Sequence, residues 1–392
     1  MADPRQHIMP VYAPPEEIFE RGEGARLFTK DGTAYLDFIA GIAVSALGHS
    51  HPALVGALTD QAQKLWHTSN MFRVEAGEHF ADKICARTFA DRVFFTNSGT
   101  EAIECALKAA RKYHWANGAP ERIDFVTFTG AFHGRSLGAI NAGGNPKYLE
   151  GFGPAIPGFH QIEFGDHEAL DAAVGETTCA VLVEPVQGEG GVRAIPEQCL
   201  DGLRKLCDER GALLIYDEVQ CGVGRTGKLF AHEWAQQAEP DIMAVAKGIG
   251  GGFPLGACLM TEAVGKVMQP GSHGSTYGGN PLAMAVGNAV WDIVSDEAFL
   301  EGVRRVSGTL AQGLKSLADS HPDKVEGITG KGLLCGLKLK DAPKPIQHAA
   351  RARQLLVGVA GNNVLRMAPP LIITDEDVRE AIGIVDAALS EA

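Results

Sequence analysis

The chain has 392 residues, too many for one compact core, so two or three structural units are expected. Hydrophobic residues make up 45% and charged residues 21% of the sequence, as in ordinary globular proteins, and no stretch approaches the roughly 18 consecutive apolar residues of a membrane helix. The net charge of −13 argues against a nucleic-acid-binding surface, but it leaves room for small anionic ligands, which a few arginines can bind.

The first 47 residues are rich in turn formers, with short strands expected at 27–29 and 35–38. Between about residue 90 and residue 260, short apolar runs alternate with helix-like stretches. Continuous apolar runs of this length are typical of strands buried on both faces, and the alternation predicts a mostly parallel sheet covered by helices. The expected strands are 93–96, 125–128, 180–183, 212–216, 242–246 and 255–260.

Apolar residues at helical spacing lie between these runs. They are Ile103, Ala106, Leu107 and Ala110 in one stretch, and Leu200, Leu203 and Leu206 in another. A further helix is expected from about Pro281, followed by strands at 333–339 and 364–367 in a mixed α+β region.

The expected fold class is therefore α/β, with a large domain built on a mostly parallel sheet and a smaller α+β domain. We assign residues 48–286 to the large domain and 287–392 to the small one. The N-terminal segment, residues 1–47, is expected to contribute to the small domain.

The cysteines and the N-terminus bear on the compartment. The eight cysteines are scattered without a C-x-x-C pair, and residues 1–20 contain no apolar core of a secretion signal. These features predict a cytoplasmic protein whose thiols are free and mostly buried.

Polar residues follow several of the expected strands. They are Ser98, Gly99 and Thr100 after the first, Glu184 after the third, Asp217 and Glu218 after the fourth, and Lys247 after the fifth. Ligands of open α/β sheets bind beyond the carboxyl ends of the strands. The pattern therefore predicts that a polar, partly desolvated site is assembled there.

Lys247 stands between an apolar run and the glycine-rich segment 248–252. A lysine placed where water is scarce favours the neutral amine, which can attack a carbonyl carbon. Taken alone, a solvated or phosphate-contacting lysine is the commoner interpretation. Asp217, on an expected neighbouring strand, could pair with a protonated pyridine nitrogen or simply cap the next turn.

The segment 98–102 opens the helix that follows the first expected strand. Its amides, its two hydroxyls and the positive end of the helix dipole predict a phosphate-binding seat. The same residues also fit a capping box, with Ser98 as N-cap and Glu101 three residues later.

Other motifs lack a required residue. The segment 222–228 nearly matches the ATP P-loop, but Leu229 stands where a Mg²⁺-binding Ser or Thr is needed. The glycine run at 248–252 lacks the third glycine of a dinucleotide motif, and no G-x-S-x-G elbow occurs. His49 and His51 lack a third ligand, so structural roles are predicted and no metal is expected.

The ordered set of motifs closely resembles the class III (ornithine/acetylornithine-type) aminotransferases, from about Gly22 to the end of the chain. The segments that carry the resemblance are 98–102, 132–135, 183–191, 217–220, Lys247 and 274–281. The resemblance implies the fold-type I architecture and pyridoxal 5′-phosphate as cofactor. It also implies an obligate homodimer whose active sites lie at the subunit interface.

The resemblance further implies a role for each matching residue. Lys247 would hold the cofactor as a Schiff base and move the proton, and Asp217 would pair with the ring nitrogen. The other implied cofactor contacts are Ser98, Gly99 and Thr100 near the phosphate, Phe132 and Val219 on the ring faces, Gln220 at the ring hydroxyl with Glu218 beside it, and Thr276 from the partner subunit.

Charge narrows the choice of substrate. Glutamate and 2-oxoglutarate carry two carboxylates, which planar arginines bind well, and the candidates are Arg135 and Arg366. When an ω-amine reacts, Arg366 would face only methylene groups, and an unpaired buried guanidinium is costly. Glu189 resembles the switch glutamate of the family, which implies that it pairs with Arg366 in one half-reaction and moves aside in the other.

Ile42 stands where ornithine aminotransferases carry a tyrosine that holds the free α-amino acid end of the substrate. Because isoleucine cannot form a hydrogen bond, an acylated α-nitrogen is easier to accept. The segments 41–44 and 66–70 resemble acetylornithine-type members, and Ser275 is expected to contact the substrate from the partner chain.

The expected reaction therefore moves the δ-amino group of N2-acetyl-L-ornithine to 2-oxoglutarate. The products are N-acetyl-L-glutamate 5-semialdehyde and L-glutamate, in arginine biosynthesis, and N-succinyl-diaminopimelate of lysine biosynthesis is a further expected substrate. Alternatives are succinylornithine, ornithine or 4-aminobutyrate as amino donor, an aminomutase, or a catalytically silent binding protein.

Overall fold

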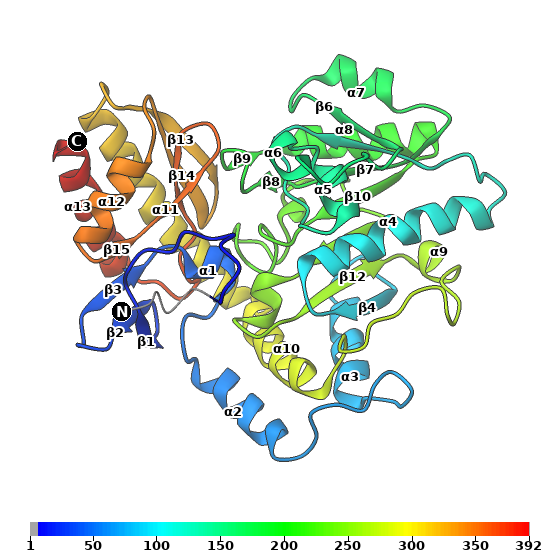
Figure 1. Ribbon diagram of the computed structural model, residues 1–392, viewed down its shortest axis with the longest axis horizontal. Helices are drawn as coiled ribbons and strands as arrows, with labels where there is room; N and C mark the ends of the chain where they lie inside the picture. Colours follow the sequence, from blue (N-terminus) through cyan, green and yellow to red (C-terminus); the bar gives the residue numbers. More distant parts are fainter. Residues whose placement is uncertain (1–6, 392) are drawn as a thin grey trace.

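In the computed structural model, which describes residues 7–391, a seven-stranded sheet forms the centre of the larger part of the molecule (Figure 1). Its strand order is β4-β12-β11-β10-β7-β5-β6. The strands are β4 (Arg92–Thr96), β5 (Asp124–Phe128), β6 (Phe159–Ile162), β7 (Thr178–Val183), β10 (Leu213–Asp217), β11 (Ile242–Val245) and β12 (Gly256–Met260). The mostly parallel sheet expected from the sequence is confirmed.

Two features of this sheet were not predicted. The edge strand β6 contains the polar residues His160 and Gln161, so it lacks the continuous apolar run of the central strands. Strand β12 is antiparallel to both β11 and β4. Only residues 246–255 connect β11 to β12, too few for the crossover that a parallel neighbour needs, so the chain reverses there.

Helices cover both faces of the sheet, which explains its apolar strands. In β10, Leu214 and Tyr216 pack with Leu200 and Leu203 of α8 (Glu197–Arg210) in one buried cluster. Leu213 and Ile215 point to the opposite face, where the predicted apolar stripe of α4 (Gly99–Ala116) is buried. The other helices of this part are α2 (Pro52–Ala62), α3 (Glu75–Cys85), α5 (Leu137–Gly143), α6 (Pro146–Leu149), α7 (His167–Ala173), α9 (Glu262–Gly265), α10 (Pro281–Val294) and the 3₁₀ turns η1 (Ala231–Trp234) and η2 (Lys247–Gly250).

The smaller part, on the left of Figure 1, contains a sheet with the order β13-β14-β17-β16. Its elements are α11 (Glu297–Ser320), β13 (Val325–Lys331), β14 (Leu334–Leu339), α12 (Lys344–Ala352), β16 (Gly358–Ala360), β17 (Val364–Met367) and α13 (Asp375–Glu391). The strands expected at 333–339 and 364–367 correspond to β14 and β17.

The N-terminal segment joins this smaller part. Strands β1 (Phe19–Glu23), β2 (Arg26–Thr29) and β3 (Ala34–Asp37) form a second four-stranded sheet with β15 (Leu355–Leu356), and α1 (Ala40–Ala43) follows them. A short hairpin of β8 (Val186–Gln187) and β9 (Arg193–Ala194) lies beyond the end of β7. The domain boundaries assigned at 47/48 and 286/287 stay predictions.

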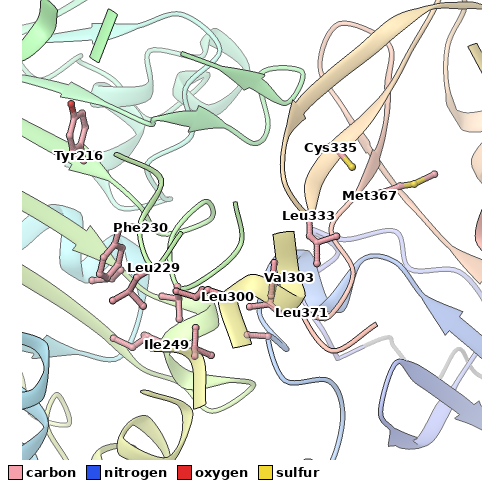
Figure 2. Close-up of a cluster of buried hydrophobic side chains, with 14 of the residues drawn as sticks. Tyr216, Leu229, Phe230, Ile249, Leu300, Val303, Leu333, Cys335, Met367 and Leu371 are labelled. Carbon is pink, nitrogen blue, oxygen red and sulfur yellow. The ribbon is translucent and has the colours of Figure 1, made fainter. Parts of the chain in front are cut away.

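One continuous core connects the two parts (Figure 2). Tyr216, Leu229, Phe230 and Ile249 belong to the larger part, and Leu333, Cys335, Met367 and Leu371 lie on the side of the smaller sheet. Leu300 and Val303 of α11 lie between these two groups in the figure. Because both groups bury apolar area in the same cluster, the hydrophobic effect fixes β17 relative to β10.

Within residues 7–391, no helix combines the length and the hydropathy needed to cross a membrane. All eight cysteines are free thiols, and Cys85 and Cys199 are the two that are only partly buried.

Candidate active site

A cavity of about 470 Å³ lies beyond the carboxyl ends of β4, β7, β10 and β11. Most of the residues singled out from the sequence line it: Ser98, Gly99, Thr100, Phe132, Arg135, Glu184, Glu189, Asp217, Val219, Gln220 and Lys247. The predicted convergence of polar strand ends on one site is thus found in the structure.

Lys247 occupies the reversal between β11 and β12, where it begins the turn η2 with a φ of 50°. The amine is buried, and this desolvation lowers the pKa of Lys247. The nearby carboxylates of Glu189 and Asp217 have the opposite, smaller effect. A larger fraction of the amine is therefore uncharged and nucleophilic than in a solvated lysine.

Asp217 ends β10, and its register partner on β11 is Ala244, which places it at the same edge of the sheet as Lys247. Its carboxylate is held by two donors. Oδ2 lies 2.7 Å from Nδ1 of His133, and Oδ1 accepts a 3.0 Å hydrogen bond from the amide of Val219. Asp217 thus has a fixed orientation at the cavity wall.

His133 was not among the predicted site residues, although it lies inside the motif 132–135. Burial by itself would lower the pKa of His133, but the hydrogen bond and the negative charge of Asp217 outweigh it, so the pKa is raised. The imidazole therefore binds a proton more readily than a solvated histidine does, and Nδ1 can donate its hydrogen to Asp217. Only the three-dimensional neighbourhood of Asp217 reveals this role.

Glu184 is a second buried carboxyl in the cavity wall. It follows β7, and its Oε2 accepts a 3.1 Å hydrogen bond from the amide of Phe132. Burial, reinforced by the negative charge of Asp217, raises the pKa of Glu184 to about 8. At neutral pH the group is therefore mostly protonated, which limits the negative charge beside Asp217.

The first turn of α4 also borders the cavity. Ser98 is the N-cap, and its Oγ accepts a 3.3 Å hydrogen bond from the amide of Glu101, so the predicted cap is confirmed. The amides of Gly99 and Thr100 have no acceptor within the helix by virtue of their position. Together with the helix dipole, these amides form a seat for an anionic group.

Close backbone packing keeps this seat narrow. A Cβ on Gly99 would lie 2.7 Å from Cγ1 of Val219, and a Cβ on Gly134 would lie 2.3 Å from Oγ1 of Thr100. Oγ1 of Thr100 is also 3.0 Å from Oγ of Ser136. Side chains larger than hydrogen are therefore excluded at both glycines.

The cavity fits the cofactor that the resemblance implies. It combines an amine of lowered pKa, a carboxylate whose orientation is fixed, and a seat of amides for a phosphate, and the side chains of Phe132 and Val219 line the space between. No other group of residues in the described part of the chain brings these three features together.

Arg366 of β17 lies beside the cavity with its guanidinium buried. Its Nη1 contacts Oε1 of Glu189 and donates to the carbonyl of Gly188 at 3.3 Å and to Oε1 of Gln220 at 3.4 Å. Glu189, in the hairpin between β8 and β9, therefore neutralises Arg366. Arg135 is exposed, and its guanidinium stacks over the ring of Tyr148 at 3.8 Å.

Besides Arg366, which lies beside the cavity, four predicted site residues do not line it in the single chain: Ile42, Glu218, Ser275 and Thr276. The carboxylate of Glu218 accepts 2.8 Å hydrogen bonds from the amides of Ala231 and His232, so it anchors the segment after Asp217. Ser275 is near the cavity through its 3.3 Å contact with Asn97, whereas Thr276 is exposed.

The two histidines at 49 and 51 have local partners. Nε2 of His49 lies 2.8 Å from Oδ2 of Asp37, and His51 caps α2 by accepting from the amide of Ala53. Across residues 7–391, no group of His, Cys, Asp and Glu side chains is arranged to hold a metal ion.

The raised pKa of Glu184 predicts a measurable pH dependence. Between its ordinary value of 4.5 and about 8, this carboxyl is deprotonated in the unfolded chain but keeps its proton in the folded protein, so wild-type stability falls as pH rises through this window. Glu184→Gln should therefore gain stability relative to wild type from about pH 5 to about pH 8.

Thermal unfolding of the cofactor-free proteins, measured across this range, checks the prediction. Glu176→Gln, the same change at an exposed glutamate, is the control. Parallel stability curves for Glu184→Gln and wild type would contradict a shifted carboxyl at this position.

Comparison with known proteins places the chain in one family. The sequence profile described as Aminotransferase class-III matches residues 10–389. "Acetylornithine aminotransferase 2" of Caulobacter vibrioides is 57% identical over 99% of this chain and 96% of its own length. "Acetylornithine/succinyldiaminopimelate aminotransferase" of Yersinia pestis is 45% identical over 98% and 96%.

Solved structures agree with the sequence comparison. A structure of the ornithine aminotransferase from Toxoplasma gondii, described with partial occupancy of PLP at its active site, superimposes with a TM-score of 0.92. The two sequences are 32% identical, and the match covers 98% of this chain and 92% of the other. A cavity built around Lys247 and Asp217 and a match over almost the full length lead to one conclusion: the chain belongs to the class III aminotransferases.

Proposed function

We propose that the protein is a pyridoxal-phosphate-dependent aminotransferase that transfers the δ-amino group of N2-acetyl-L-ornithine to 2-oxoglutarate, giving N-acetyl-L-glutamate 5-semialdehyde and L-glutamate. The observation that carries this proposal is the ion pair of the buried Arg366 with the half-buried Glu189 beside the cavity that contains Lys247. The pair suits an enzyme that alternates between a dicarboxylate and an ω-amine. The names of the two relatives described above support the same substrate.

Pyridoxal phosphate, when bound, supplies an electron sink that allows an amino group to pass from one substrate to another. Lys247 holds the cofactor and moves the proton at the carbon that carries the amine, for which its lowered pKa prepares it. Asp217, oriented by the contact with His133, would pair with the ring nitrogen and keep it protonated.

The remaining cofactor contacts hold the ring in place. The amides of Gly99 and Thr100 with Ser98 would bind the phosphate, Phe132 and Val219 would pack against the two faces of the ring, and Gln220 would contact the ring hydroxyl; all of these residues line the cavity. Glu218 does not contact the cavity. Its hydrogen bonds to the amides of Ala231 and His232 anchor the segment that carries Asp217 and Gln220.

The arginines account for the second substrate. Arg366 binds the carboxylate next to the reacting carbon of glutamate or 2-oxoglutarate, and Arg135 binds the distal one. When acetylornithine reacts, no carboxylate lies near Arg366, so Glu189 pairs with it and avoids a buried unpaired charge. The structure has this pair closed.

Ile42 favours an acylated substrate. Its side chain is 46% exposed and lies in a left-handed turn with a φ of 65°, a conformation that is rare for a β-branched residue. A hydrocarbon side chain offers no partner to a charged α-amine, whereas an uncharged N-acyl group has less hydration to lose. The Yersinia pestis relative extends the proposal to N-succinyl-diaminopimelate.

An apolar surface supports the proposed homodimer. Trp66, Met71, Phe72 and Tyr277 are all more than half exposed. They lie together, because Nδ2 of the Asn70 side chain donates to the carbonyl of Ser275 at 2.9 Å and the rings of His67 and Tyr277 are 5.2 Å apart. Exposed apolar surface of this kind marks an interface.

In the proposed dimer, Ser275 and Thr276 complete the partner's active site. The enzyme works in the cytoplasm without nucleic-acid or membrane partners.

Comparing substrates tests the proposal directly. Steady-state kcat/KM on acetylornithine, succinylornithine, ornithine and 4-aminobutyrate, each with 2-oxoglutarate, should be highest for the two N-acylated donors. Ornithine should be at least about tenfold poorer, because its charged α-amine would be desolvated without a partner at Ile42. A preference for 4-aminobutyrate would overturn the assignment.

Glu189→Ala separates the two half-reactions. Without its carboxylate, Arg366 stays unpaired while acetylornithine reacts, so that half-reaction should slow by about 100-fold, whereas the half-reaction with glutamate should change by less than about threefold. Single-turnover absorbance changes of the bound cofactor measure each half-reaction separately. Equal loss in both would contradict the switch role.

A further inference from the structure

Arg225 lies in the segment 222–228, whose likeness to an ATP P-loop leads to no nucleotide site. The side chain is only 2% exposed and does not line the active-site cavity. Among residues 7–391 it has no carboxylate partner within ion-pair distance. A large buried cation without a counter-ion needs a structural or functional reason.

The contacts of Arg225 join the two parts of the molecule. Its carbonyl accepts a 2.9 Å hydrogen bond from the amide of Leu333. Its Nη1 donates to the carbonyl of Leu333 at 3.3 Å and to the carbonyl of Pro369. Leu333 directly precedes β14 and Pro369 follows β17, and these two strands pair with Gly336 opposite Arg366. Arg225 therefore binds the paired ends of β14 and of β17, the strand that carries Arg366.

The segment bound by Arg225 also contacts the N-terminal segment. The amide of Ala368 donates to the carbonyl of Phe38 at 2.8 Å, and the amide of Leu371 donates to that of Ala46 at 2.7 Å. Ile42 lies between those two acceptors in the sequence. Residues 368–371 thus lie between the loop of Arg225 and the segment that carries Ile42.

Burial lowers the pKa of Arg225 to about 10, so the group is still charged at neutral pH. Its planar guanidinium donates hydrogen bonds in fixed directions, which a flexible lysine amine does not. Carbonyl acceptors offset only part of the desolvation cost of a charge. The contacts of Arg225 with these carbonyls therefore constrain the position of the two strand ends more than they add to the free energy of unfolding.

We propose that Arg225 is a positioning residue for Arg366, an inference that rests on the proposed function. It holds the end of β17 against the segment 217–228, which carries Asp217 and Gln220. The guanidinium of Arg366 is thereby kept beside the cavity that Lys247 and Asp217 line, where it would meet the carboxylate next to the reacting carbon of the substrate. Figure 2 shows Leu333, whose backbone Arg225 contacts, and Leu371, two residues after Pro369, among the buried apolar side chains of the core.

The test compares three variants of the holoenzyme. Arg225→Met removes the carbonyl contacts but fills the space, and Arg225→Lys keeps the charge. Arg304→Met is the matched control, because Nη1 of Arg304 also donates to a carbonyl of the same loop, that of Gly227 at 2.8 Å, from the smaller part of the molecule. Among residues 7–391, the hydrogen bonds of Arg304 go to Gly227 and Glu297 and none goes to Pro369.

Two readouts are needed. The first is the Kd of glutarate, a dicarboxylate without a reacting carbonyl, measured by calorimetry. The second is KM for 2-oxoglutarate against KM for acetylornithine. For Arg225→Met we expect glutarate binding and KM for 2-oxoglutarate to weaken by about tenfold, because small displacements of an arginine weaken its charge-assisted contacts strongly.

In the same variant, KM for acetylornithine and the absorbance of the bound cofactor should stay within about twofold of wild type, because these depend on Glu189, Lys247 and Asp217. Arg304→Met should resemble wild type in every readout. Arg225→Lys should show the same pattern as Arg225→Met with a smaller amplitude, and it decides the question if the methionine variant does not fold.

The proposal is overturned by unchanged glutarate binding in a folded Arg225 variant, by equal losses in Arg304→Met, or by loss of cofactor absorbance together with glutarate binding. Failure of the proposed function looks different: the wild-type enzyme would not transfer an amino group to 2-oxoglutarate, whatever the Arg225 variants do.

Discussion

The site depends on one constraint, which is that the amine of Lys247 is kept away from bulk water at the edge of a sheet whose strands are buried on both faces. Burial lowers the pKa of Lys247, and the reversal from β11 to the antiparallel β12 places the residue there. Asp217 reaches the same edge because β10 and β11 are parallel neighbours. His133 then supplies the hydrogen bond that orients Asp217, and Glu184 stays mostly protonated beside it, so the wall of the cavity does not accumulate negative charge.

The second requirement is that residues far apart in the sequence keep a fixed distance. The cofactor residues come from the central sheet, whereas Arg366 comes from β17 and Ile42 from the N-terminal segment. A common core and the contacts of Arg225 connect these pieces. The ion pair of Arg366 and Glu189 is therefore held at a defined place beside the cavity. There it can open for a substrate with a carboxylate next to the reacting carbon and stay closed for one without.

Much of this arrangement could be predicted from the sequence, because continuous apolar runs and the polar residues that end them are local signals. Those signals predict the strands β4, β5, β7, β10, β11 and β12 and the helix cap at Ser98. They also predict that Lys247 and Asp217 lie at one site beyond the ends of the strands. The edge strand β6 was not predicted, because it contains polar residues. The antiparallel direction of β12 was not predicted either, because it depends on the length of the connection from β11. The hydrogen-bond partners of Asp217 and Arg225 were not predicted. His133 and Asp217, like Arg225 and Pro369, are far apart in the sequence, and no sequence pattern indicates that they meet. The roles of Ser275 and Thr276 depend on a second subunit and stay predictions.

The central claim is that the amine of Lys247, and no other, binds the cofactor. Treating the purified yellow enzyme with borohydride, digesting it and sequencing the labelled peptide by mass spectrometry tests this claim most directly. The account predicts a pyridoxyl group on Lys247 alone, and none on the Lys247→Ala protein. Label on another lysine, or a preparation without any B6-derived absorbance after incubation with pyridoxal phosphate, would contradict it.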